Sequence, residues 1–95
     1  MPTADFIQQT LTPVFQTHRV HRAVLFGSYA KGTARENSDI DIYVESNLRG
    51  LAFFGLLEDV SAALDRPVDL IDAAQIDADS PIAREIHSTG VPIYG

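Results

Sequence analysis

Apolar residues recur along the chain in two spacings, one typical of helices and one typical of strands. Five apolar residues of the N-terminal segment follow helical spacing: Phe6, Ile7, Leu11, Val14 and Phe15. They predict an amphipathic helix packed on the core. Pro13 lies inside this segment and lacks a backbone N–H, and Thr12 before it could cap a new helix. We therefore expect a kink here, or two short helices.

Short apolar runs predict three strands further along the chain. Residues 23–26 form such a run and end at Gly27, residues 40–45 alternate between apolar and polar, and residues 68–71 form a third run. Residues 28–35 are expected to form a short helix, followed by a turn at 36–38 and later by a loop at 46–50. Residues 51–64 predict a longer helix, which Arg66-Pro67 stops. Its apolar face is formed by Phe53, Leu56, Leu57, Val60 and Leu64.

The last third of the chain carries clear helix start and stop signals. Ser80-Pro81 is expected to cap a helix that runs to about residue 88, where Gly90 ends it. Residues 91–94 predict an edge strand. The alternation of helices and strands predicts an α/β or α+β fold, with a small mixed β-sheet covered by helices. With 95 residues, the chain is expected to form a single domain, residues 1–95.

Composition narrows the classes of function. The formal net charge of -6 argues against a general nucleic-acid binder, which needs a basic surface to displace counterions from phosphates. The chain contains no cysteine, so disulfides, thiol catalysis and cysteine zinc sites are excluded. The longest apolar run, residues 51–57, is too short to span a bilayer, and the first residues do not resemble a secretion signal. We expect a cytoplasmic protein that does not bind membranes.

Two aspartates mark the part of the sequence that indicates chemistry. Asp39 and Asp41 are two residues apart on a predicted strand, so both carboxylates project from the same face. Their mutual repulsion is relieved by a divalent cation such as Mg²⁺. Alone this pattern is weak, because an acidic chain forms such pairs by chance. Asp77 and Asp79 form a similar pair, which we interpret as part of a solvated loop.

A glycine and a serine lie just before these acids, directly after the first predicted strand. Gly27 allows a tight turn and a close backbone approach to a ligand, and the Ser28 hydroxyl could join an anion site. An isolated pair of this kind is more often a simple turn with a helix cap. Together with the two aspartates, it predicts a phosphate site beside a metal site, as phosphoryl chemistry requires.

The chemistry also needs an acid that activates the attacking hydroxyl. Asp69 lies in the third predicted strand and points away from the core. The alternative is an exposed charge on an edge strand. Asp72 is a competing candidate, but its spacing to Gln75 is that of a helix-capping box.

Three rival site types do not fit the sequence. Gly27 and Gly32 have the spacing of a Walker phosphate loop, but Thr33-Ala34 follows where a lysine and then a serine or threonine must stand. A calcium loop that starts at Asp39 lacks its glycine and its final glutamate. A glycosidase needs carboxylates that flank a sugar cleft, which adjacent positions do not provide.

The order of these motifs resembles the DNA polymerase β-like nucleotidyltransferase superfamily, and within it the minimal nucleotidyltransferase (MNT) domains. The resemblance rests on Gly27-Ser28, ten further residues and Asp39-Ile40-Asp41, and on the later segments 53–58 and 67–70. It implies a polymerase β-like core in which Asp39, Asp41 and Asp69 are catalytic and hold magnesium, two ions in all. It also implies that Gly27 and Ser28 bind the triphosphate of ATP.

The resemblance further implies a partner and a biological role. MNT proteins of this kind are antitoxins of HEPN-type toxins, and some transfer AMP from ATP to a tyrosine of the toxin. The expected function is therefore a protein adenylyltransferase antitoxin. The alternative is a non-catalytic binding module that neutralises its partner sterically, for which the acidic surface is suited.

Several other polar residues could take part without clear support from the sequence. Lys31 and Arg35 could neutralise phosphate charge, although exposed helix cations are usually solvated, and Tyr43 shares the strand face of the aspartates. The histidines are expected to lie on the surface and not to bind metal: His18, His21 and His87. Phe53 and Phe54 are assigned to the core side of their helix, with one ring possible at a partner surface.

Overall fold

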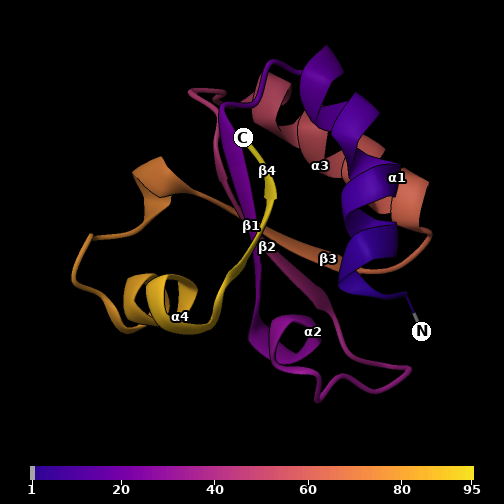
Figure 1. The fold of residues 1–95 in the computed structure, drawn as a ribbon. Coiled ribbons are helices and arrows are strands. Elements are labelled where there is room, and N and C mark those ends of the chain that lie inside the picture. The colour runs from indigo at the N-terminus through magenta and orange to yellow at the C-terminus, as the bar shows by residue number, and fades with distance from the viewer. Residues whose placement is uncertain (1) are drawn as a thin grey trace.

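The computed structural model describes residues 2–95 as alternating helices and strands. Figure 1 shows them as a central sheet with helices on both sides. In chain order they are α1 (Ala4–Thr17), β1 (Arg22–Phe26), α2 (Gly27–Lys31), β2 (Ile40–Glu45), α3 (Leu51–Leu64), β3 (Val68–Asp72), the 3₁₀ helix η1 (Ala73–Gln75), α4 (Pro81–Thr89) and β4 (Val91–Tyr94).

The four strands form one mixed sheet in the order β3-β2-β1-β4. β1 is antiparallel to both of its neighbours, β2 and β4. β2 and β3 are parallel and are joined through α3, because parallel neighbours need a crossover connection. The predicted fold class is confirmed, and β4 is an edge strand as expected.

α1 and α3 cover one face of the sheet and form the main core with it (Figure 1). The alternation of β2 supplies this core with every second side chain, and the two helices contribute their apolar stripes. The largest fully buried side chains of this core are Phe15, Ile7, Leu11, Leu25, Ile40, Ile42, Leu56, Ile93, Val44 and Val60. Phe15 of α1 also contacts Tyr94 of β4, with ring centroids 5.4 Å apart.

The second face of the sheet is only partly covered. α4 packs on it through Ile86, which forms a small cluster with Val24 and Phe26 of β1. The polar side of β2 lies on this face, since its residues alternate between buried and half-buried. The uncovered part of this face is where the predicted site residues lie.

Of the two outcomes expected at Pro13, two short helices is wrong, because α1 is one continuous helix from Ala4 to Thr17. A kink stays a prediction. Pro13 is exposed, so it lies away from the buried face of the helix. Hydroxyl groups satisfy carbonyls in the same helix: Thr12 Oγ1 donates to the Gln8 carbonyl at 2.7 Å, and Thr17 Oγ1 to that of Pro13 at 2.9 Å. The core contacts of the helix's buried face stabilise it by more than the loss of one backbone hydrogen bond at Pro13 destabilises it.

Two further expectations need correction. The helix after Gly27 is shorter than predicted and ends at Lys31, because Gly32 adopts a left-handed conformation with φ +75° that ends the helix. Phe6 does not join the core, since 53% of its surface is exposed. Of the two phenylalanines of α3, Phe53 packs against the core and Phe54 is 53% exposed.

The predicted caps are confirmed. The Asp72 carboxylate accepts a hydrogen bond from the Ala74 N–H at 3.1 Å, and the Gln75 side-chain oxygen accepts one from the Asp72 N–H at 2.9 Å. Together these bonds form the capping box of η1. Ser80 caps α4 through the Ala83 N–H at 3.2 Å, and Gly90 ends that helix. Within residues 2–95, no helix is long and apolar enough to cross a membrane.

Candidate active site

The strand register gathers the predicted acids around Asp41. Asp41 pairs with Phe26 on the antiparallel side and with Asp69 on the parallel side. Facing residues of paired strands have closely spaced Cβ atoms, so the Asp41 and Asp69 side chains are neighbours. Asp39 precedes β2 by one residue and is exposed. The structure therefore brings together three acids from two strands.

Gly27 lies directly against Asp41. Its φ of +72° is in the left-handed region, and a Cβ added here would collide with the Asp41 carboxylate. The chain can therefore turn from β1 into α2 beside Asp41 only without a side chain at this position. Ser28 follows as the second residue of α2 and is half-buried. The predicted phosphate-binding pair thus adjoins the predicted metal-binding pair.

The electrostatics of the site centre on Asp41. Burial, together with the negative charges of Asp69, Asp39 and Glu85, raises the pKa of the Asp41 carboxyl from 3.8 to about 6. Any cation bound here would relieve this repulsion, and carboxylate oxygens are ligands that Mg²⁺ prefers. However, no three His, Asp or Glu side chains in residues 2–95 converge closely enough to form a metal site. The carboxylate oxygens are suitable ligands for a divalent cation, but the side chains do not converge on a single point.

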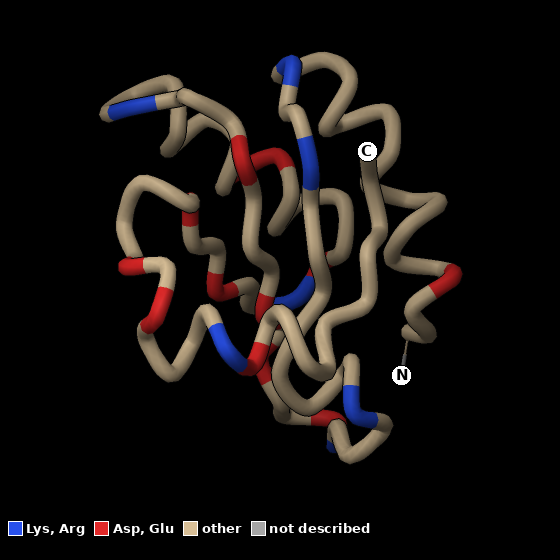
Figure 2. Tube along the Cα trace, turned by 60° about the vertical axis from the view of Figure 1, so that its left-hand side comes forward, with Lys and Arg blue, Asp and Glu red and all other residues tan. Residues whose placement is uncertain are grey.

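Glu85 is a fourth acid that the sequence did not reveal. It belongs to α4 and lies close enough to act on Asp41. Glu85 Oε2 also pairs with Lys31 Nζ of α2 at 3.4 Å, and both side chains are partly exposed. Figure 2 shows several acidic positions close together where the sheet ends, with basic positions among them. A cation, Lys31, thus lies next to the cluster of acids. Its role in neutralising phosphate charge stays a prediction. Arg35 is exposed and forms no ion pair within residues 2–95.

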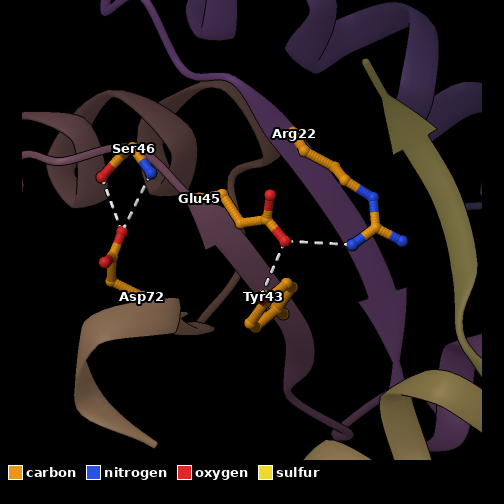
Figure 3. A network of polar contacts seen from close by, with 5 residues as sticks. All are labelled: Arg22, Tyr43, Glu45, Ser46 and Asp72. Atoms are coloured by element: carbon orange, nitrogen blue, oxygen red, sulfur yellow. Dashed lines mark hydrogen bonds and ion pairs between the residues drawn. The ribbon is translucent and has the colours of Figure 1, made fainter. Parts of the chain in front are cut away.

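A second polar network lies further along the same face of the sheet (Figure 3). Tyr43 donates its hydroxyl to Glu45 Oε2 at 2.9 Å, and Arg22 Nη1 pairs with the same oxygen at 3.1 Å. Burial and the bond to Glu45 raise the pKa of Tyr43 to about 12, so this side chain stays a neutral donor. Tyr43 thus borders the site face, as its place on the strand indicated.

Asp72 belongs to the structure of the loops and not to the group of acids around Asp41. It is 5% exposed, and its Oδ1 accepts hydrogen bonds from the Ser46 N–H at 3.1 Å and the Ser46 hydroxyl at 2.7 Å (Figure 3). These bonds tie the end of β2 to η1. The preference for Asp69 over Asp72 as a site residue is therefore supported by the contacts of Asp72.

The remaining candidates lie apart from the acids. Asp77 and Asp79 stay in an exposed loop. His18 contacts a carboxylate that the sequence did not place nearby, since its Nε2 lies 2.7 Å from Asp59 Oδ2. His21 contacts Asn47, with 3.3 Å between His21 Nε2 and the amide nitrogen. No group of three potential ligands forms at any histidine of residues 2–95.

Comparison with known proteins decides the family. The family model described as polymerase beta, nucleotidyltransferase matches residues 9–95. The chain belongs to this family. The match covers all the predicted site residues, from Gly27 to Asp69, and confirms the resemblance stated from the sequence. The roles of the individual residues stay predictions.

Similar proteins include a protein adenylyltransferase and chains of solved toxin–antitoxin structures. This family member is 37% identical over 73 residues to the protein adenylyltransferase MntA of Shewanella oneidensis, covering 75% of this chain and 51% of that protein. It thus spans about half the length of that relative. A solved structure of a toxin–antitoxin with AMP-PNP is 28% identical, with a TM-score of 0.79, over 93% of this chain and 73% of that chain.

A further structure shows the same fold at lower identity. It contains a tri-AMPylated Shewanella oneidensis HEPN toxin in complex with an MNT antitoxin, and is 23% identical to this family member. The TM-score is 0.73, over 98% of this chain and 73% of that chain. At this identity the similarity establishes the fold alone.

Proposed function

We propose that this chain is a magnesium-dependent nucleotidyltransferase that moves AMP from ATP to a hydroxyl group. The observation that carries the proposal is the position of Asp41. It faces Asp69 across the parallel pair, lies against the side-chain-free turn at Gly27, and has its pKa raised by burial and by the surrounding acids. Such a concentration of negative charge is costly without a cation and is typical of a site that binds one.

Each site residue has a defined task in this reaction. Asp39, Asp41 and Asp69 would hold two Mg²⁺ ions, which supply Lewis acidity and neutralise the charge that develops on the phosphates. The Gly27–Ser28 turn binds the triphosphate. Asp69 accepts the proton of the acceptor hydroxyl, whose oxygen bonds to the α-phosphorus as the bond to the leaving pyrophosphate breaks. The acceptor keeps the AMP.

The acceptor we propose is a tyrosine of a HEPN-type toxin, which makes this protein its antitoxin. The name of the Shewanella relative, a protein adenylyltransferase, and the toxin–antitoxin structure with AMP-PNP support a protein acceptor and a nucleotide donor. The net charge of -6 supports the same choice, because it disfavours a nucleic-acid acceptor.

Nucleotide transfer by the Asp41→Asn variant tests the enzyme. The proposed partner, a purified HEPN-type toxin, is incubated with ATP, Mg²⁺ and either form of this protein, and the intact masses of both chains are measured. We expect adenylate on the partner with the wild type and a transfer rate lower by roughly a hundredfold or more with the variant. Full activity of Asp41→Asn would disprove the metal assignment.

Binding of the donor is measured separately. At a ligand concentration of 100 times Kd, Mg²⁺ and ATP should stabilise the wild type by about 2.7 kcal/mol, seen as a higher midpoint of thermal unfolding. The Asp41→Asn variant should lose most of this stabilisation. If saturating Mg²⁺ and ATP leave the wild-type midpoint unchanged, the chain has no functional donor site.

A second candidate function is neutralisation of the partner without catalysis. The observation that favours it is that no three potential ligands converge on a metal position in residues 2–95. The test is inhibition of the toxin by the Asp39→Asn, Asp41→Asn double variant. Inhibition equal to that of the wild type would support a steric antitoxin, and loss of inhibition would support the enzyme.

A further inference from the structure

A pocket of about 790 Å³ lies on the partly covered face of the sheet, apart from the acids. Its apolar surface comes from Val24 of β1, from Ile76 and from Ile86 of α4. Tyr43 of β2 also lines it, and Arg22 and Arg84 contribute charged groups. Pockets of this size that combine apolar walls with a few polar groups are typical of binding sites.

The position of the pocket relative to Asp41 follows from the strand register. Val24 pairs with Tyr43, two residues along the strands from the pair of Phe26 and Asp41. Residues two apart on a strand share a face and are about 7 Å apart. Gly27 lies beyond Phe26, on the other side of Asp41. Along the sheet, Asp41 therefore lies between the Gly27 turn and the pocket.

The geometry of phosphoryl transfer relates this order along the sheet to the direction from which the acceptor approaches. The attacking and leaving oxygens lie on opposite sides of the phosphorus, roughly in line. If the pyrophosphate leaves at the Gly27–Ser28 turn, as the proposed function requires, the acceptor hydroxyl must arrive from the side of the pocket. We propose that this pocket anchors the protein acceptor. The inference rests on the proposed function and adds the place where the acceptor docks.

The chemistry of the pocket indicates what the acceptor inserts. The walls formed by Val24, Ile76 and Ile86 suit an aromatic or branched aliphatic side chain. Arg84 is exposed and forms no ion pair within residues 2–95, although the chain as a whole has a net charge of -6. An unneutralised cation on an acidic protein favours an acidic partner group.

Arg22 and Tyr43 strengthen this assignment. Both are bound to Glu45, which fixes their side chains at the pocket (Figure 3). The Arg22 side chain is still 47% exposed, so it can contact a second carboxylate. The occupant is therefore a partner segment in which an apolar anchor is flanked by acidic residues, and it docks beside the hydroxyl that receives AMP.

The test compares two pocket variants with a matched surface variant. Arg84→Glu reverses the charge at the pocket, and Ala83→Phe fills the pocket from α4, because Ala83 also lines it. Arg49→Glu is the control, since it makes the same charge change at an exposed residue that does not line the pocket. Affinity for the proposed HEPN-type partner is measured for each, with thermal unfolding in Mg²⁺ and ATP as a second measurement.

We expect both pocket variants to bind the partner about tenfold more weakly or worse, whereas Arg49→Glu binds as the wild type does. The KM for the partner should rise with little change in kcat, and the stabilisation by Mg²⁺ and ATP should stay. Unchanged affinity in both pocket variants, or an equal loss in Arg49→Glu, would overturn the inference while the enzyme assignment stands. A wild type that neither binds nor modifies the partner would instead disprove the proposed function, and the docking site with it.

Discussion

At the scale of single residues, the two left-handed glycines on either side of α2 allow a controlled experiment. Gly27 and Gly32 have φ values of +72° and +75°, so alanine costs about 1–2 kcal/mol of backbone strain at either position. They differ in their surroundings. An added Cβ at Gly27 collides with the Asp41 carboxylate, whereas at Gly32 nothing lies within 4 Å.

We predict that Gly27→Ala abolishes nucleotide transfer and that Gly32→Ala keeps most of it. Both variants should lose stability, with the larger loss in Gly27→Ala because it also displaces the Asp41 side chain. Transfer assays and denaturant unfolding of the two variants measure this. Equal loss of activity in both would mean that backbone strain, and not contact with Asp41, accounts for the effect.

The raised pKa of Asp41 predicts how stability depends on pH in the absence of metal. Its carboxyl has a pKa of about 6 in the folded protein, against an ordinary value of 3.8, so it binds a proton more tightly in the folded state than in the unfolded state. The resulting stabilisation is present below about pH 4 and is lost as the pH rises through 6. With EDTA present, the unfolding midpoint of the wild type should therefore fall, relative to that of Asp41→Asn, between pH 4 and pH 7.

The control for this pH effect is Asp79→Asn, which removes a carboxylate from an exposed loop. The difference between wild type and Asp79→Asn should stay nearly constant over the same range. A pH-independent difference between the wild type and Asp41→Asn would show that burial and the neighbouring acids do not raise the pKa of Asp41 in the folded state.

At the scale of secondary-structure elements, α1 contains a proline that the fold tolerates without needing it. Pro13 is exposed, and it cannot donate to the carbonyl one turn before it. We predict that Pro13→Ala stabilises the protein by about 1–3 kcal/mol, because alanine restores a backbone donor and has the higher helix propensity. Denaturant unfolding measures the gain, and Gln16→Ala in the same helix is the control, with little expected change. A loss of stability in Pro13→Ala would mean that the proline ring makes stabilising contacts in the folded protein.

At the scale of the whole molecule, local patterns predicted the elements and could not predict how distant elements meet. The alternation in residues 40–45 was sufficient to define β2, and the Ser80 and Asp72 caps were confirmed where the spacing placed them. The expectation of two helices divided at Pro13 was wrong because core contacts of Ile7, Leu11 and Phe15 override local preference.

The site was predicted in part for the same reason. Spacing within one strand placed Asp39 and Asp41 on one face, but only the strand order puts Asp69 next to Asp41. Nothing in the sequence around Glu85 indicates that α4 brings it to the acids and to Lys31. Contacts of this kind depend on tertiary packing, which one sequence does not encode in a local pattern.

The pairing of β1 with β4 also has a consequence for the newly made chain. β1 ends at Phe26 and its partner strand β4 begins at Val91, so one edge of β1 stays unpaired until β4 has been made. At the usual 5–20 residues per second, the ribosome needs roughly 3–13 s to make the segment between them. During that time β2 can already form a hairpin with β1, but Ile93 is missing from the core. The nascent protein therefore passes through a stage in which one strand edge is unpaired. Chaperones, or other strands that pair wrongly, would bind at this edge.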